Sequence, residues 1–241
     1  ILNPATKEHW IYKRFFEERG IQEGFNGVKD DVTYIHTTYL DNVENLDESF
    51  LNEVKRIEQT NPQKYKHQIL GGWLNKAEGV IFSNWRIDEF KDTNFGCFGQ
   101  DFGFSIDPTT LIQASIDKVN KKIYAKELIY KPSLTTTDIY NENIRYTSRN
   151  GLIVADSAEP RLIQELKNRG LNIKAVEKPK IIDRIALMQD YELIIDKDST
   201  NLIKELNNYV WHDKKSQTPI DDYNHALDAL GYAVWNLLGK Q

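Results

Sequence analysis

The segment GCFGQDFGFSIDPTTLIQASIDKVNKKIYAKELIY, residues 96–130, decides the predicted fold. It contains apolar runs of strand length, with β-branched and aromatic residues in each. The pairs Asp107-Pro108 and Val119-Asn120 are typical of turns and separate these runs. The segment therefore predicts consecutive β-strands at residues 96–104, 110–117 and 122–130.

Beyond this meander the sequence alternates between helical and strand patterns. Apolar residues at helical spacing predict helices, and short apolar runs predict strands. The expected helices are residues 137–147, 161–169, 181–190, 200–208 and 223–238, and the expected strands are 152–155, 173–176 and 193–195. Such an order gives a mixed α/β sheet with helices on both faces. The succession β-β-β-α-β-α-β-α is that of the RNase H-like fold, although a fold alone does not establish a function.

The first part of the chain has a different character. Amphipathic helices are expected at residues 6–19 and 47–59, a strand at 32–40, and a short helix from Pro62 to the pair Gly71-Gly72. This stretch is rich in helices and carries too little apolar surface for a complete core. Because the chain also begins abruptly at Ile1, we expect it to be a fragment of a longer protein.

The composition of the 241 residues is that of an ordinary globular protein, with 40% hydrophobic and 28% charged residues. No run approaches the roughly 20 apolar residues that a membrane-spanning helix needs. The single cysteine, Cys97, excludes an internal disulfide and a cysteine-built zinc site, and it favours a reducing compartment. The net charge of −5 does not favour nucleic-acid binding, but residues 118–131 and 161–184 are enriched in basic side chains.

Three aspartates stand where this fold would place chemistry. Asp101 lies in the first strand of the meander, Asp156 at the carboxyl end of strand 152–155, and Asp228 in the last helix. An aspartate in apolar surroundings costs several kcal/mol to desolvate unless a partner neutralises it. Two divalent cations would neutralise this group and hold the attacking and leaving oxygens of a phosphodiester. Carboxylate ligands select Mg²⁺ or Mn²⁺.

Each of these aspartates also has a structural interpretation. Asp156 would begin a helix as a capping residue, and Asp228 would lie on the solvated face of an amphipathic helix. Asp101 is the strongest candidate, because its neighbourhood is otherwise apolar and rich in glycine. The occurrence of all three on the elements where this fold needs carboxylates favours the metal site.

Further polar residues surround this predicted site. His225 precedes Asp228 by three residues and shares its helix face, so we expect it beside the metal; the alternative is a helix-start histidine with a local hydrogen bond. Additional acidic residues that complement helix starts are candidates to assist there: Asp221, Asp222 and Glu159.

Basic residues near the expected edge of the site are candidates for binding DNA. They are Lys178, Lys180 and Arg184. The alternative for each is a solvated helix face. We expect weak, salt-sensitive binding without sequence preference, because phosphate contacts carry little sequence information.

Several segments, taken in order, resemble motifs of the large terminase subunit of tailed double-stranded DNA bacteriophages. The segment YIHTTYLDN at 34–42 looks like a motif late in the ATPase domain of that family, and Asn3-Pro4 with His9-Trp10 resembles the stretch after the domain's coupling motif. The family's nuclease motifs resemble GQDFGF at 99–104 followed by Asp107-Pro108, ADSAEP at 155–160, and NHALDAL at 224–230.

The resemblance implies part of a two-part motor. In this family an N-terminal ATPase drives viral DNA into a procapsid, and a C-terminal nuclease cuts the concatemer. By motif match, Asp101, Asp156 and Asp228 are the metal-binding aspartates of that nuclease, and His225 lies close to the metal, which would be two Mg²⁺ or Mn²⁺ ions. The phosphate-binding pattern G-x-x-x-x-G-K-[ST] does not occur in this sequence, so we expect no ATPase activity from it.

The resemblance also predicts the organisation and the partners of the chain. Residues 1–70 would be the end of the ATPase domain, 71–92 a linker, and 93–241 the RNase H-like nuclease domain. The expected partners are double-stranded DNA and, in the full motor, the small terminase subunit and the portal protein. We expect no membrane association, a monomeric fragment, and a location in the cytoplasm of the bacterial host.

Two other classes of function remain open on the sequence. A resolvase, a transposase or an RNase H could use the same three carboxylates on the same fold, although the terminase-like N-terminal segment argues against them. The chain could also be a module that docks on DNA or on the portal without cutting.

Overall fold

The computed structural model describes residues 6–7, 9–60, 62–74, 79–212 and 218–239, and the chain divides into two compact units, Ile1–Ala77 and Glu78–Gln241. Among the described residues, no helix is long and apolar enough to cross a membrane. The domain boundaries expected from the sequence, at 70 and 92, remain predictions.

The first unit is small and mostly helical. It contains α1 (Trp10–Tyr12), the hairpin of β1 (Gly27–Lys29) and β2 (Val32–Tyr34), α2 (Glu48–Thr60) and α3 (Pro62–Lys64). Asp47 caps α2 as its residue type predicts, because its Oδ1 accepts a hydrogen bond from the Phe50 N–H at 3.0 Å. The strand expected at 32–40 is shorter than predicted.

The end of that strand is set by the threonines and aspartate of the segment at 34–42. The Thr38 side chain accepts a hydrogen bond from the Leu40 N–H at 3.2 Å, and the Asp41 carboxylate accepts one from the Thr38 N–H at 2.7 Å. This reciprocal cap starts a tight 3₁₀ helix at Tyr39–Asn45. The local hydrogen bonds therefore replace the extended backbone that the alternation of residues predicted.

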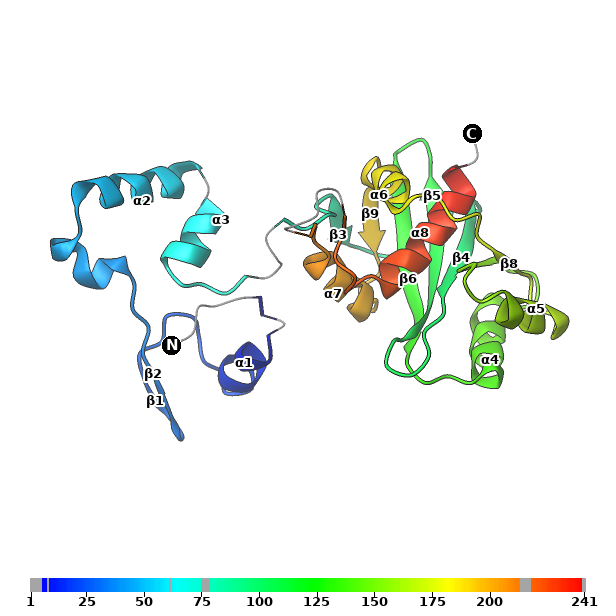
Figure 1. The fold of residues 1–241 in the computed structure, drawn as a ribbon, viewed down its shortest axis with the longest axis horizontal. Coiled ribbons are helices and arrows are strands. Elements are labelled where there is room, and N and C mark those ends of the chain that lie inside the picture. The colour runs from blue at the N-terminus through cyan, green and yellow to red at the C-terminus, as the bar shows by residue number, and fades with distance from the viewer. Residues whose placement is uncertain (1–5, 8, 61, 75–78, 213–217, 240–241) are drawn as a thin grey trace. The chain divides into compact units, whose positions relative to one another are not determined.

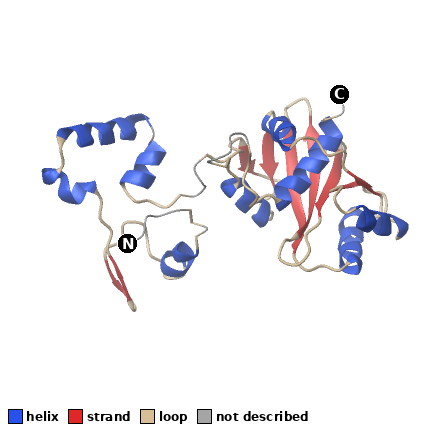
Figure 2. Ribbon diagram, in the orientation of Figure 1, coloured by secondary structure: helices blue, strands red, loops and turns tan. Residues whose placement is uncertain are grey.

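The second unit is built on a seven-stranded mixed sheet in the order β3-β9-β6-β5-β4-β7-β8. Its centre is the predicted antiparallel meander of β4 (Gly96–Asp101), β5 (Thr109–Asp117) and β6 (Lys122–Lys131). The strands β7 (Ile153–Ala155) and β8 (Ile173–Ala175) continue the sheet in parallel beside β4, and β9 (Glu192–Ile195) lies parallel to β6. Figure 2 shows this sheet with helices around it.

Helices cover both faces of the sheet, as the sequence predicted. One apolar core lies under α6 (Ile181–Gln189), α7 (Thr200–Asn208) and α8 (His225–Leu238). A second core lies under α4 (Thr136–Thr147) and α5 (Pro160–Asn168). The neighbours Leu111 and Ile112 on β5 belong to different cores, because successive strand side chains point to opposite faces. Figure 1 shows α8 crossing the central strands, where it contacts β4 and β5.

Two features of this unit differ from the prediction. The segment expected to be a linker contains β3 (Trp85–Ile87), which pairs with β9 at the edge of the sheet. In addition, β4 ends at Asp101 rather than at residue 104. The backbone turns back there, since a Cβ on Gly103 would lie 2.1 Å from the Asp107 carbonyl oxygen. Asp101 is therefore the last residue of its strand.

Candidate functional site

The sheet brings Asp101 and Asp156 to one edge. Gln100 of β4 pairs with Ala155 of β7 in parallel register, and each of the two aspartates follows its paired residue. The Asp156 N–H also donates to the Gln100 carbonyl oxygen at 3.0 Å. Both side chains are mostly buried, with 13% of Asp101 and 16% of Asp156 exposed. The carboxyl ends of these neighbouring strands therefore present two carboxylates together.

Asp228 reaches the same region from the first turn of α8. This helix approaches β4 closely because Gly99 has no side chain; a Cβ there would lie 1.8 Å from the Ala229 carbonyl oxygen. Burial raises the pKa of Asp228 to about 6, the positive charge of Arg184 opposes this rise, and the negative charges of Asp101 and Asp156 add to it. The three predicted aspartates therefore lie within electrostatic reach of one another.

A basic side chain faces each of the three carboxylates. The Nδ1 of His225 lies 3.2 Å from Asp101 Oδ2, and Lys178 Nζ lies 2.9 Å from Asp156 Oδ1. Arg184 forms an ion pair with Asp228 Oδ1. These bases offset the repulsion that three clustered negative charges would otherwise cause.

The three aspartates have the right chemistry to bind a hard divalent cation. Their side chains are not placed closely enough together to hold one ion. All three aspartates offer carboxylate oxygens, which Mg²⁺ and Mn²⁺ prefer. However, within the part of the chain that the structure describes, no three Asp, Glu, His or Cys side chains converge closely enough to hold one ion. The basic partners occupy Oδ2 of Asp101 and Oδ1 of both other aspartates. A metal ion would therefore have to bind the other oxygen of a carboxylate or displace its protein partner, as at Asp156, whose partner Lys178 is exposed.

His225 bridges two carboxylates rather than one. Its Nε2 lies 3.7 Å from Asp107 Oδ1, while its Nδ1 faces Asp101. The hydrogen bond with Asp101 raises the pKa of His225, burial lowers it, and the charges of Asp101, Glu205 and Asp107 raise it further. Asp107 therefore faces the site, although the sequence suggested only a turn role for it. Asp107 and His225 lie far apart in the sequence, so no local pattern could predict this contact.

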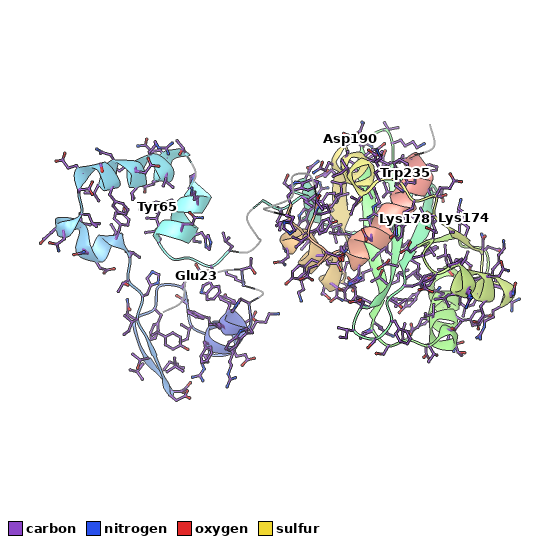
Figure 3. All side chains as sticks on the ribbon, viewed as in Figure 1. Glu23, Tyr65, Lys174, Lys178, Asp190 and Trp235 are labelled. Carbon is purple, nitrogen blue, oxygen red and sulfur yellow. The ribbon has the colours of Figure 1, made fainter. Side chains whose placement is uncertain are left out.

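The basic residues expected to bind DNA differ in exposure. Lys178 and Lys180 are exposed, in the segment that leads from β8 into α6 (Lys178 is labelled in Figure 3). Arg184 is only 5% exposed, and its guanidinium lies 4.8 Å from the centre of the Tyr232 ring. A Cβ on Gly231 would lie 2.5 Å from Arg184 Cδ, so this glycine admits the arginine against α8. The DNA contact predicted for Arg184 stays a prediction, and the burial of its charge against Asp228 argues against it.

The other acidic candidates lie at exposed positions. Asp222 Oδ1 accepts a hydrogen bond from the Tyr223 N–H at 2.9 Å, and Asp221 Oδ1 accepts one from the Asn224 side chain at 3.3 Å. Glu159 is exposed just before α5. These contacts give Asp221 and Asp222 a local role in the turn before α8, and whether they assist a metal stays a prediction.

An RNase H-like sheet with three carboxylates at one edge defines the class to which this protein belongs. Comparison with known families identifies the particular family within that class. The model described as "Phage terminase large subunit" matches residues 1–72, and the model described as "Terminase RNAseH like domain" matches residues 101–236. The second match covers more than half of the chain. The chain belongs to the phage large terminase family.

Individual relatives agree with this assignment. The chain is 32% identical to the large terminase subunit of Bacillus phage SPP1 over 95% of its own length and 56% of the relative's. It is 24% identical to the PBSX phage terminase large subunit of Bacillus subtilis, covering 96% of this chain and 59% of that protein. The chain thus spans little more than half the length of the curated relatives it matches.

Two solved structures show the same fold. The large terminase nuclease domain of bacteriophage SPP1, solved with bound Mn, aligns with a TM-score of 0.56 and 26% identity, over 65% of this chain and 98% of that one. The large terminase of a thermophilic bacteriophage aligns with a TM-score of 0.57 and 19% identity, over 98% of this chain and 60% of that one. The RNase H-like fold predicted from the sequence is therefore confirmed.

Proposed function

We propose that this chain carries the nuclease of a viral DNA-packaging motor and cuts concatemeric double-stranded DNA by metal-dependent hydrolysis of a phosphodiester. The observation that carries the proposal is that Asp101, Asp156 and Asp228, at the carboxyl ends of β4 and β7 and in the first turn of α8, lie within electrostatic reach of one another. The similarity to the SPP1 nuclease domain, solved with bound Mn, supports both the activity and the kind of metal. In the full motor, the partners would be the small terminase subunit and the portal protein, in the cytoplasm of the bacterial host.

The three aspartates would hold two Mg²⁺ or Mn²⁺ ions. Such ions, when bound, supply the positive charge that activates water and stabilises the leaving oxygen of the phosphodiester. Lys178 is exposed, so it leaves Asp156 and neutralises a phosphate of the bound strand. Arg184 is buried, so it stays against Asp228 and limits the repulsion within the site. His225 orients Asp101 through its Nδ1.

The ATPase function of the family does not extend to this chain in our proposal. The sequence has no G-x-x-x-x-G-K-[ST] pattern, which would supply the phosphate-binding backbone and its lysine. We therefore expect no ATP hydrolysis by the chain as given.

Neutralising each aspartate tests the nuclease proposal. Asp101→Asn, Asp156→Asn and Asp228→Asn should each abolish plasmid cleavage in Mg²⁺ or Mn²⁺, because each substitution removes a metal ligand. The fold should survive in metal-free buffer, since removing one of three clustered negative charges relieves repulsion. Asp228→Asn should still lose some stability, because it leaves the buried Arg184 without its counter-charge. Wild type should melt at a higher temperature when Mn²⁺ is added, and the three variants should lose most of that gain.

Asp190→Asn is the matched control, because Asp190 is an exposed carboxylate at the end of α6 (Figure 3). It should keep both cleavage and the response to Mn²⁺. His225→Ala should reduce cleavage less than the aspartate variants. Cleavage at the wild-type rate by any aspartate variant would remove that residue from the site. If wild type binds DNA in Mn²⁺ without cutting it, the chain is a docking module instead.

A further inference from the structure

The first turn of α8 carries both His225 and Asp228, yet it has no side-chain cap from its own sequence. The residue before the helix, Asn224, makes no capping hydrogen bond with its side chain. The first N–H groups of a helix have no partner within the helix and need one from elsewhere. This helix positions two residues of the site. The groups that accept hydrogen bonds from its first N–H groups therefore determine where its first turn lies.

Glu205 of α7 supplies these partners. Its Oε2 accepts a hydrogen bond from the Leu227 N–H at 2.9 Å, and the neighbouring Ala226 N–H helps to lower the pKa of this carboxyl group. Glu205 is only 1% exposed. A carboxylate near a helix N-terminus is favoured by the helix dipole as well as by the hydrogen bonds. Glu205 therefore caps α8 from a neighbouring helix.

The sheet fixes this capping carboxylate in place. Tyr130 of β6 donates from its hydroxyl to Glu205 Oε1 at 3.0 Å. From β5, the Thr110 hydroxyl donates to the His225 carbonyl oxygen at 3.2 Å. Two strands thus hold the start of α8, one directly and one through Glu205.

The same arrangement occurs one helix earlier. The residue before α7, Ser199, makes no capping hydrogen bond with its side chain, and Glu127 of β6 accepts a hydrogen bond from the Leu202 N–H at 2.8 Å instead. Glu127 also accepts from the Asn201 side chain at 2.7 Å. Two glutamates, the partly buried Glu127 and the buried Glu205, therefore link β6 to α7 and α7 to α8.

We propose that Glu205 is a positioning residue of the nuclease site, because it fixes the first turn of α8 and so sets where His225 and Asp228 lie relative to Asp101. The inference rests on the proposed function. Packing alone does not explain a carboxylate here, since an apolar side chain would avoid the cost of burying a charge. An apolar side chain would not accept the hydrogen bond from the Leu227 N–H.

The test compares variants of adjacent residues on α7. Glu205→Ala removes the cap, Glu205→Gln keeps an acceptor oxygen, and Leu206→Ala removes a fully buried core side chain without touching the cap. Two midpoints are measured for each: the Mn²⁺ concentration for half-maximal plasmid cleavage, and the Mn²⁺ concentration for half the metal-induced rise in Tm. The KM for DNA is measured alongside.

Glu205→Ala should raise both Mn²⁺ midpoints by about tenfold, the scale on which residues that orient metal ligands act. Its KM for DNA should not change, because the cap does not face the strand. Glu205→Gln should recover most of the loss. Leu206→Ala should lower the Tm of the metal-free protein, because it leaves a cavity in the core, and keep the wild-type Mn²⁺ midpoints.

Equal Mn²⁺ midpoints in Glu205→Ala and wild type would overturn the inference. A shift of the same size in Leu206→Ala would also overturn it, since Glu205 would then act only through stability. If Glu205→Ala does not fold, Tyr130→Phe takes its place, and unchanged midpoints in that variant would be decisive against the inference. If wild type does not cut DNA, the proposed function fails, while the thermal midpoints still decide whether Glu205 positions a metal site.

Discussion

At the scale of single residues, two bases that look alike in the sequence have opposite surroundings. Lys178 is exposed and pairs with Asp156, whereas Arg184 is buried between α6 and α8 and pairs with Asp228. An exposed ion pair contributes little to stability, but removing one partner of a buried pair leaves an uncompensated charge. Truncating Lys178 and truncating Arg184 should therefore affect different properties of the protein.

Arg184→Ala should lower the free energy of unfolding by about 3 kcal/mol, because Asp228 would remain buried without its counter-charge. Lys178→Ala should leave stability nearly unchanged and weaken DNA binding, with the slope of log affinity against log salt falling by about one. Urea unfolding in EDTA and DNA titrations at several salt concentrations measure the two effects. If Arg184→Ala kept full stability and had a reduced salt slope, Arg184 would be a DNA contact, as the sequence suggested.

Glu205 makes the stability of the fold depend on pH. Burial raises its pKa to about 7, even though hydrogen bonds from Leu227, Ala226 and Tyr130 lower it. The folded state therefore holds this proton over a pH range in which the unfolded chain, with an ordinary glutamate pKa near 4.3, has lost it. Protonation favours the folded state, so this contribution is complete at low pH and is lost as pH rises through about 7.

Glu205→Gln should remove that dependence, because an amide does not titrate. The variant should match wild type near pH 4, below the unfolded pKa, and exceed it at pH 8 by a few kcal/mol at most, on the scale of about 1.4 kcal/mol for each unit of pKa shift. Urea unfolding across this range, in the absence of metal, gives the comparison. A difference between the two proteins that stays constant with pH would show that Glu205 is not the titrating group.

At the scale of elements, the contact between α8 and β4 determines whether the site forms. Gly99 should not tolerate a side chain, since a Cβ there would lie 1.8 Å from the Ala229 carbonyl oxygen of a rigid helix backbone. Gly99→Ala should lower stability by about 3 kcal/mol or more, as overpacking of a core does. It should also weaken the response to Mn²⁺, because α8 would move Asp228 away from Asp101.

Gly239→Ala is the control for this prediction. A Cβ on Gly239 would meet only side-chain atoms of Trp235, at 2.5 Å, near the other end of α8. That variant should keep the wild-type Mn²⁺ midpoint in a thermal melt even if it loses some stability. A normal Mn²⁺ midpoint in Gly99→Ala would mean that the spacing of α8 and β4 does not set the metal site.

The sequence was sufficient to predict the elements whose hydrophobic pattern runs through one long continuous segment. The meander from β4 to β6 was predictable because its strands are apolar runs of strand length separated by recognisable turns. The three-residue strand β3 was not, since WRI forms a strand only through its pairing with β9, far along the chain. Short strands depend on a partner that local pattern cannot identify.

The candidate site shows the same limit. The aspartates stood out because a carboxylate in an apolar strand or helix is unusual, and the structure brings them together. Arg184 looked like a surface base because its burial depends on Gly231 and Tyr232 of another helix. No pattern in the sequence singled out Glu205, although it caps α8. In both residues, the role is fixed by tertiary packing that no local pattern records.

At the scale of the whole molecule, the two units differ in how large an apolar core each contains. The second unit contains both apolar cores of the sheet, whereas buried apolar residues are few among the described residues of the first unit: Tyr34, Val54, Trp73 and Leu74. A unit with its own core can fold alone, and a short segment with little buried surface is marginal. The SPP1 nuclease domain, which this chain matches over 98% of that domain's length, was solved without the rest of its terminase.

Residues 78–241 should therefore fold as an independent domain and carry the whole nuclease site. Every residue assigned to the site lies in this range, from Asp101 to Asp228, and so does the positioning residue Glu205. The fragment should melt cooperatively, with the same Mn²⁺ midpoint and the same cleavage rate as the full chain. Residues 1–77 alone should give no cooperative transition, because their buried apolar surface is too small to offset the entropy of folding. If the larger fragment folds but responds to Mn²⁺ at a different concentration, the first unit contributes to the metal site, and the assignment of that site to β4, β7 and α8 alone is wrong.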